Sequence, residues 1–120
     1  MLRRIAAAIC IALVPGAIAA PKAKGPTECD YFWDAAIVAR GFAIAGATPA
    51  QLEQAMAQIY GEINAQPPSE NEQRIAEILG AIGRAAVVSS SKRASEFAAK
   101  LSNTCYERRG DMNSVLGVAL

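Results

Sequence analysis

The stretch TECDYFWD, residues 27–34, contains the side chains of this sequence that are best suited to chemistry. It holds Cys29, three carboxylates and three consecutive aromatic residues. A cysteine in the first turn of a helix can act as a nucleophile, because the helix dipole favours the thiolate. The chain, however, has no histidine to serve as a base and no Cys-x-x-Cys motif to supply a resolving thiol. Histidine-based metal sites and acid–base catalysis are excluded as well, so we predict that the protein is not an enzyme.

The three carboxylates, Glu28, Asp30 and Asp34, are the candidate metal ligands or catalytic acids. Three carboxylates within seven residues could bind a hard cation. Acidic residues near the start of a helix more often complement its dipole, and paired acids alone are a weak sign of catalysis. We therefore predict no catalytic residue, no metal site and no cofactor.

The first nineteen residues predict that the chain is exported. A basic start at Arg3 and Arg4 precedes an apolar run over residues 5–14, and small residues at 17–19 fit a cleavage site. This is the pattern of a secretory signal peptide at 1–19, so we expect cleavage before Ala20. A retained membrane anchor would need about 20 apolar residues, roughly twice this run. We predict a periplasmic location, with full secretion as the alternative, and no stable membrane insertion after cleavage.

Two cysteines remain after this cleavage, Cys29 and Cys105. Thiols are oxidised in the periplasm and outside the cell, and two cysteines in one chain allow a single intramolecular pairing. A disulfide between two chains is the alternative. Closing a loop of about 77 residues stabilises a fold by roughly 4 kcal/mol at most. We therefore interpret Cys29 as one end of a structural disulfide.

The spacing of the apolar residues predicts three helices, each opening at a hydroxyl residue. Thr27, Thr48 and Ser69 each lie three positions before an acid or an amide, which is the capping-box arrangement. After Thr48 and Ser69 the apolar residues recur at steps of three and four. The run from Thr27 to Ile44 is apolar almost all round, which predicts a helix at the centre of a bundle. In the third helix, Gly80 and the glycine at 83 should let a neighbouring helix approach closely.

Residues 88–93 divide the C-terminal half of the chain. The apolar stripes at 75–86 and 94–105 differ in direction by roughly a quarter turn at 100° per residue. If the two cysteines are paired, the start of the first helix meets the end of the last, which requires an even number of helices in an up-and-down bundle. We therefore predict a small all-α bundle of four helices with a break near Ser90. The alternative is that the last two helices are one kinked helix.

Residues 20–120 are long enough for one helical domain. The last helix should end at Gly110, and an apolar tail follows at 111–120. Apolar chain ends seldom stay solvated, so we expect the tail to fold back over the bundle. The alternative is a tail that docks on a partner.

The charge of the processed chain is nearly balanced, with ten Lys and Arg against eleven Asp and Glu from Ala20 onward. Nucleic-acid binding usually needs a strongly basic face, so we exclude it. The charge is unevenly placed, with a net −4 over residues 20–79 and +3 over 80–120. The C-terminal bases either attract the acidic first helix or form a face for an anionic partner. The candidate partner-binding residues are Lys92, Arg93, Lys100, Arg108 and Arg109.

The signal sequence, Cys29, Cys105 and the amphipathic helices together resemble those of small proteobacterial periplasmic proteins that are all-helical and hold a disulfide. Acid-stress chaperones and immunity proteins are the two groups that the chain resembles. The resemblance implies a periplasmic helical protein and carries over no functional residue. We predict an exported protein-binding domain, such as an inhibitor, an immunity protein or an assembly accessory protein. The alternative is a holdase-type stress chaperone.

Overall fold

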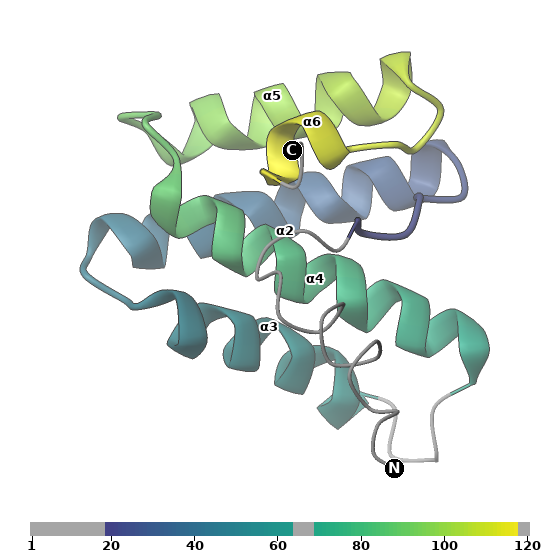
Figure 1. Ribbon diagram of the computed structural model, residues 1–120, viewed down its shortest axis with the longest axis horizontal. Coiled ribbons are helices and arrows are strands. Elements are labelled where there is room, and N and C mark those ends of the chain that lie inside the picture. Colours follow the sequence, from purple (N-terminus) through teal and green to yellow (C-terminus); the bar gives the residue numbers. More distant parts are fainter. Residues whose placement is uncertain (1–18, 64–68, 118–120) are drawn as a thin grey trace, which may run out of the picture.

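Residues 19–63 and 69–117, which the computed structural model describes, fold into helices joined by short connections (Figure 1). This described part contains five helices and no strand, which confirms the predicted all-α class. Their bounds are α2 Pro26–Ile44, α3 Pro49–Ile63, α4 Glu70–Val88, α5 Ala94–Glu107 and α6 Asn113–Leu116. Residues 1–18 of the expected signal peptide lie outside the described residues. None of the helices that are described is long and apolar enough to cross a bilayer.

The helices α2 to α5 form the predicted up-and-down bundle. Helix α2 packs against α5 and α4, and α3 packs against α4 (Figure 1). Cys29 at the start of α2 is bonded to Cys105 at the end of α5, while Arg40 near the end of α2 contacts Ser91 just before α5. The two helices therefore run antiparallel, as the pairing of the cysteines requires.

The starts of α3 and α4 confirm two of the three predicted capping boxes. The hydroxyl of Thr48 accepts a hydrogen bond from the Gln51 amide at 3.2 Å, and the Gln51 side chain accepts one from the Thr48 amide at 2.9 Å. Ser69 and Glu72 make the same pair of bonds at 3.2 and 2.9 Å. Each box satisfies two backbone donors that a helix leaves free at its start.

The predicted cap at Thr27 is wrong, because α2 begins one residue earlier, at Pro26. Proline suits the first helical position, since its fixed φ matches the helix and its missing N–H would have no partner there. Gly25 precedes it with a φ of 148°, which favours glycine. The carboxylate of Glu28 accepts a hydrogen bond from the Lys24 amide at 2.8 Å, which holds the chain before the helix.

The segment 89–93 is a turn between two helices, so the kinked single helix is excluded. Helix α4 ends at Val88, and Ser89 already has extended backbone angles. The guanidinium of Arg40 lies against this turn and donates to the carbonyl oxygen of Ala86 at 2.6 Å and to that of Ser91 at 2.6 and 3.1 Å. A cation is favoured there because the last carbonyls of a helix lack partners and carry its negative dipole end.

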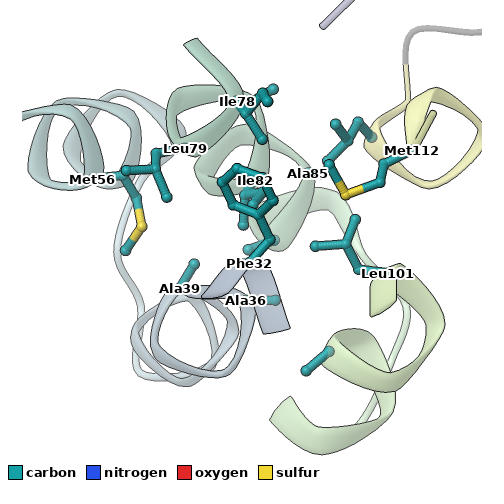
Figure 2. Close-up of a cluster of buried hydrophobic side chains, with 14 of the residues drawn as sticks. Phe32, Ala36, Ala39, Met56, Ile78, Leu79, Ile82, Ala85, Leu101 and Met112 are labelled. Atoms are coloured by element: carbon teal, nitrogen blue, oxygen red, sulfur yellow. The ribbon is translucent and has the colours of Figure 1, made fainter. Parts of the chain in front are cut away.

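The core lies between α2, α4 and α5, with α6 closing one side (Figure 2). Phe32 of α2 is fully buried, together with Ile78 and Ile82 of α4. Its neighbours in the sequence, Tyr31 and Trp33, remain 38% and 36% exposed, because consecutive residues of a helix point about 100° apart. Of the three consecutive aromatic residues, only the middle one therefore belongs to the core.

A close approach between α3 and α4 confirms the expectation from the small residues of the third helix. A methyl group added at Gly83 would lie 2.9 Å from the backbone nitrogen of Glu53 and 2.9 Å from the carbonyl carbon of Leu52. These are backbone atoms, which cannot move aside as the end of a side chain can. Gly83 is therefore the residue that sets how near the two helices come.

The tail folds back over the bundle within residues 111–117, as expected; residues 118–120 lie outside the described residues. Met112 and Leu116 are buried, and α6 packs on α4 and α5. The segment before α2 is fastened to the same end of the bundle. The amide of Ala23 donates to the carbonyl of Gly110 at 2.9 Å, and the amide of Ala20 donates to the Asn113 side chain at 2.8 Å.

Candidate functional site

Cys29 and Cys105 form the expected disulfide. Their Cα atoms are 5.7 Å apart, and both residues are buried. Cys29 therefore has no free thiol in this structure. The cysteine of TECDYFWD is part of the framework that fixes α2 against α5, and it supplies no nucleophile.

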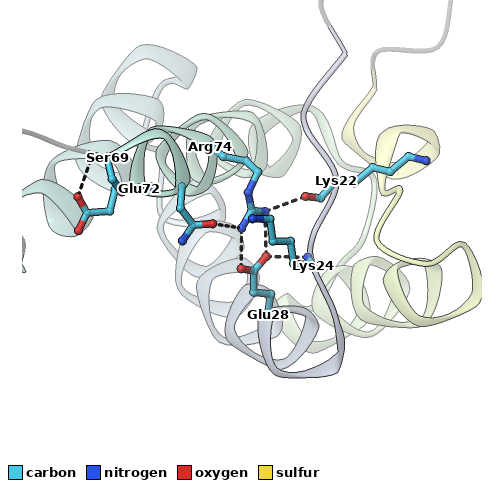
Figure 3. A network of polar contacts seen from close by, with 7 residues as sticks. Lys22, Lys24, Glu28, Ser69, Glu72 and Arg74 are labelled. Atoms are coloured by element: carbon cyan, nitrogen blue, oxygen red, sulfur yellow. Dashed lines mark hydrogen bonds and ion pairs between the residues drawn. The ribbon is translucent and has the colours of Figure 1, made fainter.

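Glu28 is held in a network of polar contacts between the start of α2 and the start of α4 (Figure 3). Arg74 donates to both of its carboxylate oxygens, at 2.9 and 2.7 Å. The same guanidinium donates to the Lys22 carbonyl at 2.8 Å and to the Asn71 side chain at 2.7 Å. The Arg74 hydrogen bonds lower the pKa of Glu28, although partial burial acts in the opposite direction. Glu28 therefore serves to anchor the N-terminal segment.

The other two acids of this stretch point to different surroundings. Asp30 accepts a hydrogen bond from the hydroxyl of Tyr106, which raises the pKa of that tyrosine because the bond holds its proton. Asp34 has no hydrogen-bond or ion-pair partner among the described residues. Within residues 19–63 and 69–117, no three Cys, Asp or Glu side chains come close enough together to hold a metal ion. The structure thus separates the three carboxylates that the sequence places side by side.

The five candidate partner-binding bases are spread along the whole of α5. Lys92 and Arg93 precede its first residue, Lys100 lies in its middle, and Arg108 and Arg109 follow its last residue. The fourteen residues of α5 span about 21 Å at 1.5 Å per residue. All five side chains are exposed, but they form no single cluster. Their role in binding stays a prediction.

An exposed apolar face runs along α2. Tyr31, Val38 and Phe42 are 38%, 43% and 58% exposed. Steps of seven and four residues place all three side chains on one side of a helix. Sequence reasoning missed this face, because a helix that is apolar all round was expected to be covered all round. The signal was present in the spacing of these three large residues.

An apolar pocket of about 210 Å³ lies beside this face. We use the term apolar pocket for the depression lined by Tyr31, Asp34, Ala35 and Val38 of α2, Met56 of α3 and Leu79 of α4. Met56 and Leu79 lie next to each other and form its buried base, since they are only 4% and 2% exposed (Figure 2). The exposed residues of α2 form its open edge. The arrangement can bind an apolar group from solution.

The surroundings of the apolar pocket are rigidly supported. Phe32 and Ala36, on the opposite side of α2, are completely buried in the core. The disulfide at Cys29 fixes one end of the helix, and the hydrogen bonds of Arg40 to the turn before α5 fix the other. This part of α2 is therefore held at both of its ends.

No protein-family model matches the chain, and neither a curated protein nor a solved structure is significantly similar to it. The candidate site therefore rests on the geometry described above.

Proposed function

We propose that the protein is exported to the periplasm and acts there as a non-enzymatic protein-binding domain, such as an inhibitor, an immunity protein or an assembly accessory protein. The observation that carries this proposal is the exposed apolar face of α2 beside the apolar pocket. Large exposed residues next to a pocket are typical of the places where proteins bind one another. Burying apolar surface there stabilises a complex by roughly 25 cal/mol per Å² before the costs of association.

The chemistry of the conspicuous residues supports a binding role over a catalytic one. The chain has no histidine. The sulfur of Cys29 is bonded to Cys105, and the carboxylate of Glu28 is bound by Arg74. The residues that first suggested reactivity are therefore engaged in holding the fold together.

The location of the exposed face favours a dedicated binder over a holdase-type chaperone. A holdase activated by stress exposes apolar surface when its fold loosens. In this protein Tyr31, Val38 and Phe42 are exposed while the core beneath them is packed. Among the described residues, the exposed part of this face is therefore present in the folded state, without any triggering event.

Site-specific photo-crosslinking in the native host tests the proposal. A photoreactive amino acid at Val38 reports on the exposed face, and one at Glu77 is the matched control, because Glu77 is exposed on α4 and does not line the apolar pocket. We expect one adduct of defined mass from the Val38 position and none of that mass from the Glu77 position. N-terminal sequencing of the same material should begin at Ala20.

Two results would count against the proposed function. The absence of any adduct at Val38 in folded, exported protein would contradict a binding role for this face. A broad series of adducts that forms only under stress would instead support the holdase alternative.

A further inference from the structure

We propose that the apolar pocket binds a helix of the partner protein that carries an apolar side chain next to a lysine or arginine, with the basic group pairing with Asp34. This inference rests on the proposed protein-binding function, and it names the class of segment that is bound. Three features of the described residues lead to it: the size of the pocket, the unpaired charge in its lining and the shape of the exposed face.

The size of the apolar pocket suits a side chain. Its volume is about 210 Å³. Sites for drug-sized molecules and cofactors usually measure roughly 300–1,000 Å³ and enclose most of the ligand. Here Met56 and Leu79 form a buried base, while Val38 at the edge stays 43% exposed. A space of this kind accepts an apolar side chain that projects from a larger surface.

Among the described residues, Asp34 is the only charged one that lines the apolar pocket. It has no hydrogen-bond or ion-pair partner in the described part of the chain. A partner that covers the pocket takes this carboxylate out of water, which costs free energy unless a cation or hydrogen-bond donors replace the solvent. The segment that binds here must therefore bring a positive charge close to its apolar anchor.

Among the described residues, no cation of the neighbouring helices is paired with Asp34. In α4, Arg74 is paired with Glu28 and Arg84 with Glu53. Helix α3 contains no lysine or arginine. Arg40 is the only base of α2, and its guanidinium is bound to the carbonyl oxygens of Ala86 and Ser91. Residues 20–79, which include both helices, carry a net charge of −4. This acidic half attracts a basic segment and disfavours an acidic one.

The shape of the exposed face fits a helical segment. Tyr31, Val38 and Phe42 extend along about three turns of α2, or roughly 16 Å at 1.5 Å per residue. An amphipathic helix that lies along another helix presents anchors at the same spacing of three, four and seven residues. The described residues contain no strand, so they offer no sheet edge to which an extended peptide could add.

A displayed peptide library tests the inference. Helical peptides of about sixteen residues carry fixed leucines at steps of three and four, with every other position randomised among Lys, Glu, Gln and Ala. The target is the full chain, expressed with its own N-terminal segment, exported and purified with its disulfide formed. We expect the selected peptides to carry Lys at one fixed spacing from a leucine. Chemical-shift changes on adding such a peptide should centre on Val38 and Met56.

Charge reversal identifies the partner of that lysine. Asp34→Lys should weaken binding of the selected peptide about tenfold, because it removes the negative charge of the interfacial ion pair and places a positive charge beside the lysine of the peptide. A peptide whose selected lysine is changed to glutamate should bind Asp34→Lys better than it binds the parent protein. Glu77→Lys makes the same change in net charge outside the pocket, and we expect it to leave the affinity within about twofold.

Several results would overturn the inference. These are the absence of any enriched peptide, enrichment without a basic residue at a fixed spacing, and equal effects of Asp34→Lys and Glu77→Lys. Self-association of the chain through Val38, seen by sedimentation, would overturn it in favour of a second copy as the occupant. The three peptide and variant results do not bear on the crosslink at Val38, so a discrete adduct with another protein would leave the proposed function standing while this inference fails.

Discussion

Arg40, four residues before the end of α2, donates two hydrogen bonds to the carbonyl oxygen of Ser91, fifty-one positions further along the chain. A third bond goes to the carbonyl of Ala86, in the last turn of α4. One guanidinium thus connects three elements: α2, the end of α4 and the turn that leads into α5. This contact holds the turn at 89–93 against the end of α2.

Replacing Arg40 by alanine should therefore destabilise the protein by about 2–3 kcal/mol, because a hydrogen bond to a charged group contributes roughly 1.5–3 kcal/mol, the bonds of one guanidinium do not add up, and a helix end is left without a partner. Urea denaturation followed by circular dichroism gives the free energy of unfolding. Arg93→Ala is the matched control, since Arg93 lies in the same turn, is exposed and makes no side-chain cap. Its effect should stay within about 0.5 kcal/mol. Equal effects of the two variants would refute the structural role of Arg40.

The close approach of α3 and α4 predicts opposite effects of two glycine substitutions. Gly83→Ala should destabilise the protein by about 1–3 kcal/mol, because its methyl group would clash with the backbone at Leu52 and Glu53. Gly41→Ala adds a methyl group within α2 that meets no described atom within 4 Å beyond its chain neighbours and the backbone of its own helix, and the higher helix propensity of alanine should stabilise the protein by about 0.5–1 kcal/mol. Thermal unfolding of both variants measures the difference. A stabilising Gly83→Ala would show that the two helices are not in contact there.

The sequence predicted the helices more fully than it predicted the site. Local patterns were sufficient for the capping boxes at Thr48 and Ser69, and the pairing of two cysteines was sufficient for the four helices of the bundle, but the short helix α6 within the tail was not predicted. The start of α2 was placed wrongly, because the helix already begins at Pro26, after its cap residue Gly25, upstream of the hydroxyl of Thr27. That error moves the cap position by two residues, from Thr27 to Gly25, and leaves the bundle unchanged.

The apolar pocket could not be predicted in the same way. Met56 and Leu79 belong to separate helices, and both look like ordinary core residues in the sequence. Only the packing of α3 and α4 against α2 brings them beneath Val38. The bases around α5 show the reverse effect, since they belong to one segment of the sequence but are spread from one end of the helix to the other.

The disulfide predicts a large loss of stability on reduction. Removing it by reductant, or by Cys29→Ser together with Cys105→Ser, should lower the free energy of unfolding by up to roughly 4 kcal/mol, because the unfolded chain regains the freedom of a loop of about 77 residues. Urea titrations with and without reductant measure this change. Mass spectrometry of protein from its native compartment should find both sulfurs oxidised in a single chain. Two free thiols, or a bond between two chains, would contradict the structure.

The last prediction concerns pH and the network at Glu28. Arg74 lowers the pKa of Glu28 below its ordinary value of 4.5, so the folded state holds the ionised form more strongly than the unfolded state does. The stabilisation is therefore complete above pH 4.5 and is lost as the pH falls through the lowered pKa of the folded state.

Glu28→Gln removes this carboxylate, and with it the part of the free energy of unfolding that depends on its ionisation. We expect the parent protein to be the more stable of the two at neutral pH, and the difference to shrink as the pH falls below 4.5. Urea denaturation of both proteins across this range measures the difference. Asp34→Asn is the matched control for removing a carboxylate from the same helix, since Asp34 has no ion-pair partner among the described residues. A difference for Glu28→Gln that stays constant from neutral to acidic pH would show that the contact with Arg74 does not stabilise the ionised form.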